Sequence, residues 1–135
     1  MQQFTFRLVG RISSKKNSRI TDRRTGRSFP SKKYTEWHKE ATAQTLDIIP
    51  DVPLTGIKRV TLEFYHPDKR KYDLTNKVES IMDFMVDVGI IHDDNYVEVP
   101  ELLLKSAGLD KKEPGCLVTI IYEEEKFLEK TYIIN

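Results

Sequence analysis

The run PDKRKYDLTNKVESIMDFMVDVGIIHDDNY, residues 67–96, constrains the fold of this chain more than any other stretch. It contains a basic cluster, an Asp-Leu-Thr-Asn segment, an amphipathic stretch and a closing Asp-Asp pair. Starting at Leu74, apolar residues recur at i, i+4, i+7, i+8, i+11 and i+14, which is one face of a helix with about 3.6 residues per turn. We therefore predict a helix over residues 74–88. Gly89 ends it, because glycine readily adopts the left-handed conformation common at helix C-termini.

The predicted helix has an apolar and a polar face. The apolar face comprises Leu74, Val78, Ile81, Met82, Met85 and Val88, and the opposite face comprises Asn76, Glu79, Ser80, Asp83 and Asp87. Asp73 precedes the helix, where such a side chain most often serves as the N-cap, while Asp93 and Asp94 follow the helix. Asp73 and Asp94 thus lie at or beyond opposite ends of one helix, and they come together only if the chain returns beside it.

The remaining elements predict a small sheet. Strands are predicted at residues 3–9, 57–65, 96–105 and 116–122, with a polar loop over residues 106–115. A second helix begins after the N-cap Ser31 and extends to about Ile48, with Tyr34, Trp37, Ala41, Thr45 and Ile48 along one face. The run 116–122 is almost continuously apolar and is typical of a central strand. The element order predicts an α/β (α+β) fold with two helices packed on a small mixed β-sheet.

Length and composition favour one domain over residues 1–135, because domains commonly have about 100–150 residues. No apolar run approaches the roughly 20 residues that cross a bilayer, so we expect no membrane partner. The N-terminal segment MQQFTFRLVG lacks the layout of a signal peptide, and the single cysteine, Cys116, excludes a disulfide within the chain. These features predict a cytoplasmic protein.

Positive charge is concentrated in one segment although the net charge is only +1. Between residues 11 and 33 the basic residues are Arg11, Lys15, Lys16, Arg19, Arg23, Arg24, Arg27, Lys32 and Lys33, against Asp22 alone. Residues 11–30 are therefore interpreted as a basic arm that binds a polyanion. Within the arm, residues 19–21 and 27–29 flank a Gly-containing turn and predict a small β-ribbon. The C-terminal tail, residues 123–135, packs back on the fold or covers a second subunit; the sequence leaves both open.

The order of motifs resembles that of the RusA family of Holliday junction resolvases, particularly its phage-type members. The shared features are the basic cluster, Asp-Leu-x-Asn, an amphipathic helix, Gly and then Asp-Asp, together with Ser14-Lys15-Lys16-Asn17-Ser18 and Pro30-Ser31-Lys32. The resemblance implies a RusA-like homodimer that binds four-way junctions or other branched DNA. It further implies a Mg²⁺- or Mn²⁺-dependent endonuclease that makes paired symmetric nicks during recombination and repair of phage or prophage DNA.

The same resemblance assigns the site. The first motif aspartate corresponds to Asp73, the late aspartate to Asp94 and the asparagine to Asn76, which are the expected catalytic residues. Expected metal ligands are Asp73 and Asp94, with Asp93 and Glu79 as further candidates, because a few carboxylates are sufficient to hold Mg²⁺. The expected DNA-binding residues are Lys15, Lys16, Arg19, Arg70, Lys71 and Lys77.

Two positions depart from the family pattern. Thr75 stands where the family has a second aspartate, and Glu79 stands where it has a lysine. Glu79 could supply the missing carboxylate, Thr75 could hydrogen-bond a metal-bound water, and Lys15, Lys16 or Lys77 could replace the lost cation. A non-catalytic branched-DNA-binding protein on the same scaffold therefore remains an alternative. A small metal-dependent phosphoesterase is disfavoured because the chain has no Gly-rich phosphate-binding loop.

Overall fold

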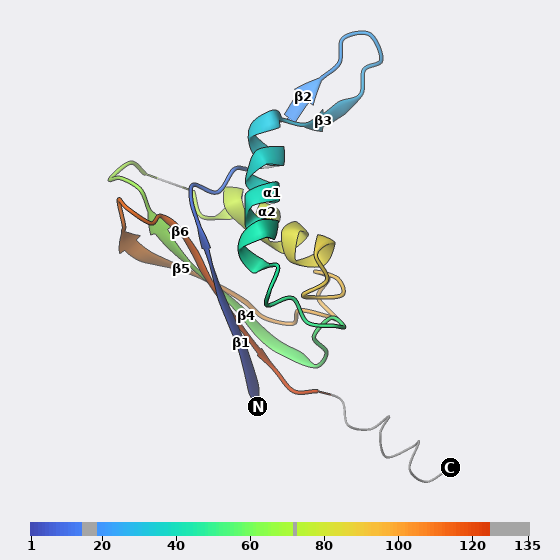
Figure 1. The fold of residues 1–135 in the computed structure, drawn as a ribbon, viewed down its shortest axis with the longest axis vertical. Helices are drawn as coiled ribbons and strands as arrows, with labels where there is room; N and C mark the ends of the chain where they lie inside the picture. Colours follow the sequence, from blue (N-terminus) through green and yellow to red (C-terminus); the bar gives the residue numbers. More distant parts are fainter. Residues whose placement is uncertain (15–18, 72, 125–135) are drawn as a thin grey trace.

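A four-stranded sheet forms one layer of the structure, a computed structural model that describes residues 1–14, 19–71 and 73–124 (Figure 1). The strands are β1 (Gln2–Val9), β4 (Ile57–His66), β5 (Leu102–Leu109) and β6 (Gly115–Tyr122), in the order β1-β6-β4-β5. β6 pairs antiparallel with β1 and β4, whereas β4 and β5 run parallel. The sheet is therefore mixed, as predicted, and β6 is a central strand.

The helices α1 (Lys32–Thr45) and α2 (Thr75–Asp87) pack on one face of this sheet. Alternate residues of the two central strands are buried, namely Val60, Leu62 and Phe64 of β4 and Cys116, Val118 and Ile120 of β6. In a strand, alternate side chains point to the same face, so this pattern identifies the covered face. Side chains of both helices complete the same core, including Trp37, Ala41, Ile81 and Met85. This arrangement confirms the predicted α+β fold class.

The sequence correctly predicts the start of α1 but not its end. Ser31 is the N-cap, as expected, and its Oγ accepts a hydrogen bond of 3.2 Å from the backbone N–H of Tyr34. Tyr34, Trp37, Ala41 and Thr45 are buried along the predicted face. The helix ends at Thr45, however, and Ile48 lies beyond it with 41% of its surface exposed. The predicted end near Ile48 is therefore wrong.

The second helix begins within one residue of the prediction, and Gly89 follows it with a φ of +85°, as expected for a helix C-terminus. The predicted polar face is wrong at Ser80, which is completely buried. Its Oγ donates a hydrogen bond of 2.7 Å to the backbone carbonyl of Ser13. Phe84, which lies outside the predicted apolar face, is also buried, against Trp37 and His38 of α1. α2 is therefore covered on two sides, by the sheet and by α1.

The predicted strand over residues 96–105 is displaced toward the C-terminus. Asn95 explains the late start, because its Oδ1 accepts hydrogen bonds from the N–H groups of Val97 and Glu98, both 3.0 Å, and holds residues 96–98 in a turn. β5 then continues into the predicted loop as far as Leu109, where its residues pair with the end of β4. This strand is at the edge of the sheet, so its C-terminal half, residues 106–109, is exposed and lacks a strand-like sequence pattern.

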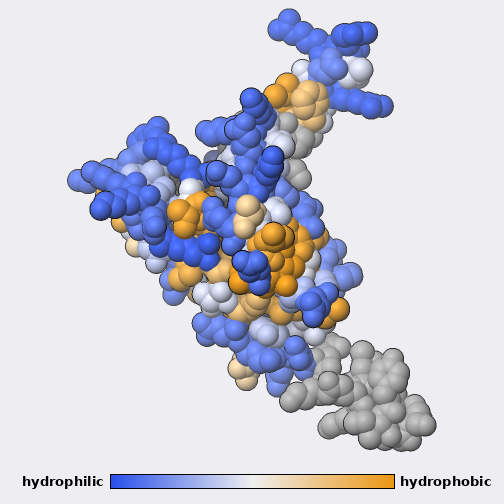
Figure 2. All heavy atoms as spheres, in the orientation of Figure 1, coloured by the Kyte–Doolittle hydropathy of each residue, from blue (hydrophilic) through white to orange (hydrophobic). Residues whose placement is uncertain are grey.

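The predicted β-ribbon is present as β2 (Arg19–Thr21) and β3 (Ser28–Pro30), which pair antiparallel. The second strand is one residue later than predicted. The ribbon projects from the N-terminal end of α1 away from the sheet (Figure 1), and its surface is largely hydrophilic (Figure 2). Arg23, Arg24 and Arg27 are exposed on it. The rest of the basic arm, residues 15–18, and the tail from residue 125 lie outside the described residues.

Candidate functional site

A hollow of about 530 Å³ lies between α2, the loop that follows it and β5. It is lined by Thr75, Val78, Glu79, Met82, Asp94, Tyr96, Val99, Leu102 and Leu104. We call it the carboxylate hollow, because Glu79 and Asp94 both line it. The chain does return beside the helix after Gly89: Ile90 and Ile91 are buried, and the backbone N–H of Leu54 bonds to the carbonyl of Ile90 at 2.9 Å. Asp94 thereby comes to lie beside the helix and not beyond its far end.

The α2 residues of this hollow form a single stripe. Thr75, Val78, Glu79 and Met82 have the spacing i, i+3, i+4 and i+7, which places them on one face of a helix. Glu79 is exposed, whereas Met82 is buried below it. The stripe therefore has an apolar floor and a carboxylate on its rim. This placement distinguishes Glu79 from an ordinary solvated position on the outer face of the helix.

Asp73 is joined to this stripe through Thr75. Its Oδ1 accepts two hydrogen bonds, one of 3.0 Å from the backbone N–H of Thr75 and one of 2.7 Å from the Thr75 hydroxyl. Leu74, and not Asp73, occupies the N-cap position, and its side chain makes no capping hydrogen bond. Asp73 therefore caps the first turn from the residue that precedes the N-cap. Thr75, which lines the hollow, thus holds the Asp73 carboxylate in place at its edge.

The two adjacent aspartates differ in their surroundings. Asp93 accepts hydrogen bonds from the backbone N–H of Asp94 at 2.7 Å and from the Asn95 side chain at 3.1 Å, and these bonds lower the pKa of Asp93. The pKa of Asp94 is instead raised, first by its partial burial, then by its hydrogen bond with Asp93 and by the negative charge of Asp83. Asp93 therefore stabilises the turn. The negative charge of Asp94, in contrast, is disfavoured by its surroundings.

The expected basic residues are distributed on different sides of this site. Arg70 forms a close ion pair with Asp68, with an Nη2–Oδ2 distance of 3.0 Å, and Lys71 is exposed beside it. Lys77 is partly buried, and its pKa is lowered first by burial and then by the charges of Arg11 and Lys33. Lys77 does not line the carboxylate hollow. The structure therefore does not support the expectation that Lys77 replaces the family's lysine at this site. Lys15 and Lys16 lie outside the described residues, as does the side chain of Arg19.

Two further features of the site were not anticipated from the sequence. Asn76, expected to be catalytic, is exposed on the first turn of α2 but does not line the hollow. Conversely, Tyr96, Leu102 and Leu104 supply apolar lining that no motif indicated. Tyr96 lies two residues after Asp94 in the sequence, and this closeness was the only indication that Tyr96 belongs to the site.

Comparison with known families shows to which family the chain belongs. The family model for Endodeoxyribonuclease RusA matches residues 10–121. The chain belongs to the RusA family. The match extends from the end of β1 to the end of β6 and includes both helices and the carboxylate hollow. The resemblance seen in the motifs is thus confirmed over most of the chain. A comparison with curated proteins gives no match.

RusA proteins are endodeoxyribonucleases that act on Holliday junctions, so this chain is a DNA-hydrolysing enzyme of a family that binds branched DNA. Within the described ranges, α1 and α2 are both too short and too polar to cross a membrane.

RusA nucleases generally depend on divalent metal ions, and the donor set of the hollow is chemically suited to one. Mg²⁺ is commonly held by one or two carboxylates, with water and phosphate oxygens as the other ligands. Asp94 and Glu79 meet that requirement at one hollow, and Asp73 stands at its edge through Thr75. Among residues 1–14, 19–71 and 73–124, no group of three or more His, Cys, Asp or Glu side chains is arranged to hold a metal ion. The fit therefore rests on two carboxylates that line the hollow and a third nearby.

Proposed function

We propose that this RusA-family enzyme is a Mg²⁺- or Mn²⁺-dependent Holliday junction resolvase that acts as a homodimer and cuts four-way junctions by paired symmetric nicks. The observation that carries the proposal is the hollow that Asp94 and Glu79 share beside the Asp73–Thr75 pair. Two symmetric nicks need two active sites, and a homodimer supplies one per subunit. Residues 1–135 would form one catalytic domain, and its DNA substrate would place it in the cytoplasm, in recombination and repair of phage or prophage DNA.

Asp94, Glu79 and Asp73 would hold the metal ion, with Asp93 as a further candidate ligand. When bound, a divalent ion supplies an activated water and neutralises charge on the transferring phosphate. Asp94 is suited to this role because its surroundings disfavour its own ionisation in the absence of a cation. In-line attack would leave a 5′-phosphate and a 3′-hydroxyl.

Thr75 and Glu79 together can replace the family's second aspartate. A second aspartate at position 75 would add a negative charge next to Asp73, whereas the Thr75 hydroxyl donates a hydrogen bond to it. The charge lost at position 75 is then regained one turn later, at Glu79, on the same stripe of α2. In this interpretation the carboxylate has moved along the helix, whereas the positive charge of the family's lysine is not replaced, so these two positions together are one unit more negative than in the family pattern. Asn76 would act on the substrate from the same helical turn.

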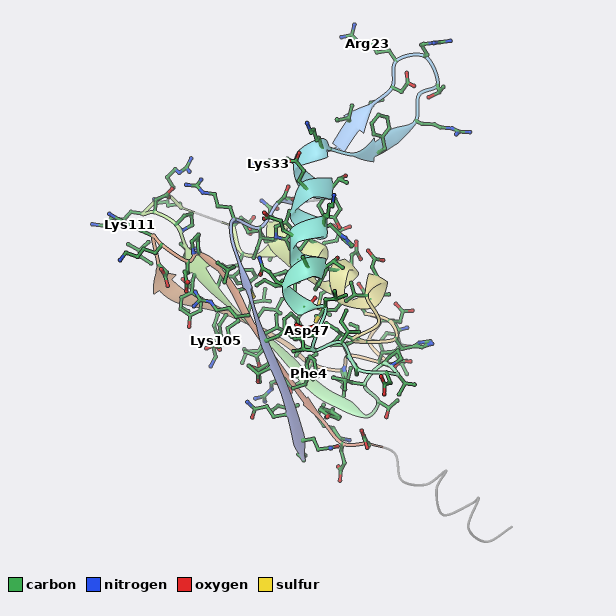
Figure 3. All side chains as sticks on the ribbon, viewed as in Figure 1. Phe4, Arg23, Lys33, Asp47, Lys105 and Lys111 are labelled. Atoms are coloured by element: carbon green, nitrogen blue, oxygen red, sulfur yellow. The ribbon has the colours of Figure 1, made fainter. Side chains whose placement is uncertain are left out.

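Basic residues outside the hollow would bind the DNA backbone. The proposed contacts are Lys15, Lys16, Arg19, Arg70, Lys71 and Lys77. The exposed arginines of the projecting ribbon extend this surface away from the sheet (Figure 3). Contacts of this kind bind phosphates irrespective of sequence, so affinity should fall steeply as the salt concentration rises.

The test is cleavage of a synthetic four-way junction, labelled in turn on each strand, with Mg²⁺, with Mn²⁺ and with chelator. Paired nicks in opposing strands that require a metal ion would support the resolvase. The replacement of a family aspartate and lysine by Thr75 and Glu79 favours one other function, a non-catalytic branched-DNA-binding protein. Tight junction binding without cleavage in either metal would establish that function instead.

A further inference from the structure

Basic side chains from three separate elements converge on the side of α2 that faces away from the carboxylate hollow. Arg11 follows β1, Lys33 lies in the first turn of α1, and Lys77 lies in the first turn of α2. Arg11 and Lys33 line one hollow of about 360 Å³, and Arg11 and Lys77 line a second, smaller one. Arg11 is common to both, so the three cations are neighbours. We call them the cationic cluster.

Asp68 connects this cluster to the basic residues before α2. One of its oxygens lies 3.8 Å from Arg11 Nη2 and 3.0 Å from Arg70 Nη2. A single carboxylate therefore lies between two guanidinium groups. On the α1 side the cluster is bordered by Glu36, itself 3.8 Å from Lys32, and by Glu40. The cluster is thus a bounded basic site in a protein of nearly zero net charge.

The like charges of the cluster oppose one another. Arg11 shares one hollow with Lys33 and another with Lys77, so these positive charges lie close together, with the Asp68 carboxylate beside Arg11. Repulsion of this kind is relieved when an anion binds between the cations, which is why such clusters attract phosphate groups. An arginine beside lysines also suits phosphate chemistry, because the guanidinium group can donate two parallel hydrogen bonds to phosphate oxygens.

The orientation of α2 separates the cluster from the carboxylates. Lys77, Ser80 and Phe84 have the spacing i, i+3 and i+7 and share one face of the helix. That face is directed toward α1 and the segment after β1, because Phe84 packs on Trp37 and Ser80 bonds to the Ser13 carbonyl. The stripe that lines the carboxylate hollow is rotated from it by about half a turn, at about 3.6 residues per turn.

We propose that Arg11, Lys33 and Lys77 form a phosphate-binding site on the face of α2 opposite the carboxylate hollow, and that this site takes a backbone phosphate next to the cleavage position. A helix with its side chains is about 10–12 Å across, so one phosphate cannot contact both faces. The N-terminal turn of α2 would then lie between two phosphates of one DNA backbone. The identification of this phosphate as part of branched DNA rests on the proposed function. The ability of the site to bind a phosphate group does not depend on that function. Figure 3 places Lys33 at the base of the projecting ribbon, where the cluster adjoins the basic arm.

The salt dependence of junction binding tests this site without requiring cleavage. Binding of a four-way junction is measured by fluorescence anisotropy in chelator, over a series of salt concentrations, for Lys77→Met, Arg11→Gln and Lys33→Gln. Each variant should weaken binding about tenfold at moderate salt and reduce the slope of log affinity against log salt by about 0.9, the value for one lost phosphate contact. Lys58→Gln is the matched control, because Lys58 is exposed at the opposite end of β4 from the cluster and carries the same charge.

Trp37 supplies a direct reporter of ligand binding. It is the single tryptophan of the chain and lines the same hollow as Arg11 and Lys33. Its fluorescence is titrated with inorganic phosphate and with junction DNA. A response to both, absent in Arg11→Gln, identifies a general phosphate site. A response to DNA alone identifies a site shaped for the nucleic acid backbone. A fluorescence response that persists unchanged in both Arg11→Gln and Lys33→Gln would overturn the proposal.

The outcomes separate this proposal from the resolvase itself. If the wild-type protein cuts junctions but all three cluster variants bind with unchanged slopes, the cluster is not a phosphate site. If the slopes fall as expected but no metal supports cleavage, the cluster stands and the proposed resolvase activity fails. Because Lys77 is partly buried, its methionine variant requires a thermal unfolding control. If it does not fold, the exposed Arg11 and Lys33 variants decide the matter, and Lys77→Arg should retain the wild-type slope.

Discussion

The hydroxyl of Thr75 donates a hydrogen bond of 2.7 Å to Oδ1 of Asp73. Thr75 stands where the family pattern has an aspartate, so a donor here replaces an expected acceptor. Removal of the hydroxyl in Thr75→Val should leave Asp73 less well oriented and lower the cleavage rate about tenfold, since one hydrogen bond to a charged group contributes about 1.5–3 kcal/mol. Thr75→Ser keeps the hydroxyl and is the control. Rates are compared under single-turnover conditions with Mg²⁺, and equal rates for the valine and serine variants would remove Thr75 from the mechanism.

The carboxylates of the proposed site should be essential for cleavage but not for binding. Asp94→Asn and Asp73→Asn are each expected to lower the cleavage rate about 100-fold or more, because metal-assisted chemistry contributes several kcal/mol. Junction affinity in chelator should remain near that of the wild-type protein. Asp47→Asn is the control, since Asp47 is exposed just after the C-terminal end of α1 (Figure 3) and does not line the hollow. Cleavage by Asp94→Asn at the wild-type rate would show that the hollow is not the active site.

Glu79 should contribute a carboxylate to the same site. Glu79→Gln is isosteric and removes only the charge. It should raise the Mg²⁺ concentration needed for half-maximal cleavage about 10–100-fold, the usual effect of disturbing a metal site. Asp87→Asn, on the same helix but outside the hollow, is the matched control. The measurement is cleavage rate against Mg²⁺ concentration. If the cleavage rate of Glu79→Gln depends on Mg²⁺ concentration as that of the wild-type protein does, Glu79 is an ordinary solvated residue and not a metal ligand.

The raised pKa of Asp94 predicts a pH dependence of folding stability. Burial, Asp93 and Asp83 raise this pKa above its ordinary value of 3.8, so the folded protein binds the proton more tightly than the unfolded chain does. The stabilisation from the protonated carboxyl is present below pH 3.8 and is lost as the pH rises through the folded pKa. In chelator, Asp94→Asn should therefore be at least as stable as the wild-type protein at neutral pH.

Asp83 provides a second measurement of the same effect. Asp83→Asn removes a nearby negative charge, so the pKa of Asp94 should move toward its ordinary value. An NMR titration of the Asp94 carboxyl group measures this shift directly. Asp51→Asn, an exposed substitution outside the hollow, is the control and should not alter the titration. A pKa of Asp94 below 3.8 in the wild-type protein would contradict both pH predictions.

The buried hydrogen bond between Ser80 and Ser13 should stabilise the packing of α2. Ser80→Ala leaves the Ser13 carbonyl without this donor and is expected to lower the free energy of unfolding by about 1–3 kcal/mol. Thr35→Ala, at an exposed position of α1, should change it far less. Urea unfolding monitored by Trp37 fluorescence measures both. Equal stabilities of the two variants would mean that water satisfies the Ser13 carbonyl.

Local patterns in the sequence were sufficient for the elements whose packing is simple. The apolar period of α2, the Ser31 cap and the φ of Gly89 all depend on residues within a turn of one another. β6 was predicted because a central strand is apolar at nearly every position. At the edge of the sheet the pattern failed: β5 is exposed in its second half, where small residues predominate, and its extent depends on pairing with β4, about 40 residues earlier in the chain.

The sequence by itself determined the fold class, the family and the set of candidate carboxylates, because each depends on residue type and short spacing. Only the tertiary structure decided which of these residues meet. The loop after Gly89 returns Asp94 to the stripe that carries Glu79, and the packing of α1 buries Ser80 and directs Lys77 to the opposite side. A helical period states which residues share a face, but the neighbours of that face are set by long-range packing, and here that packing divides carboxylates from cations across one helix.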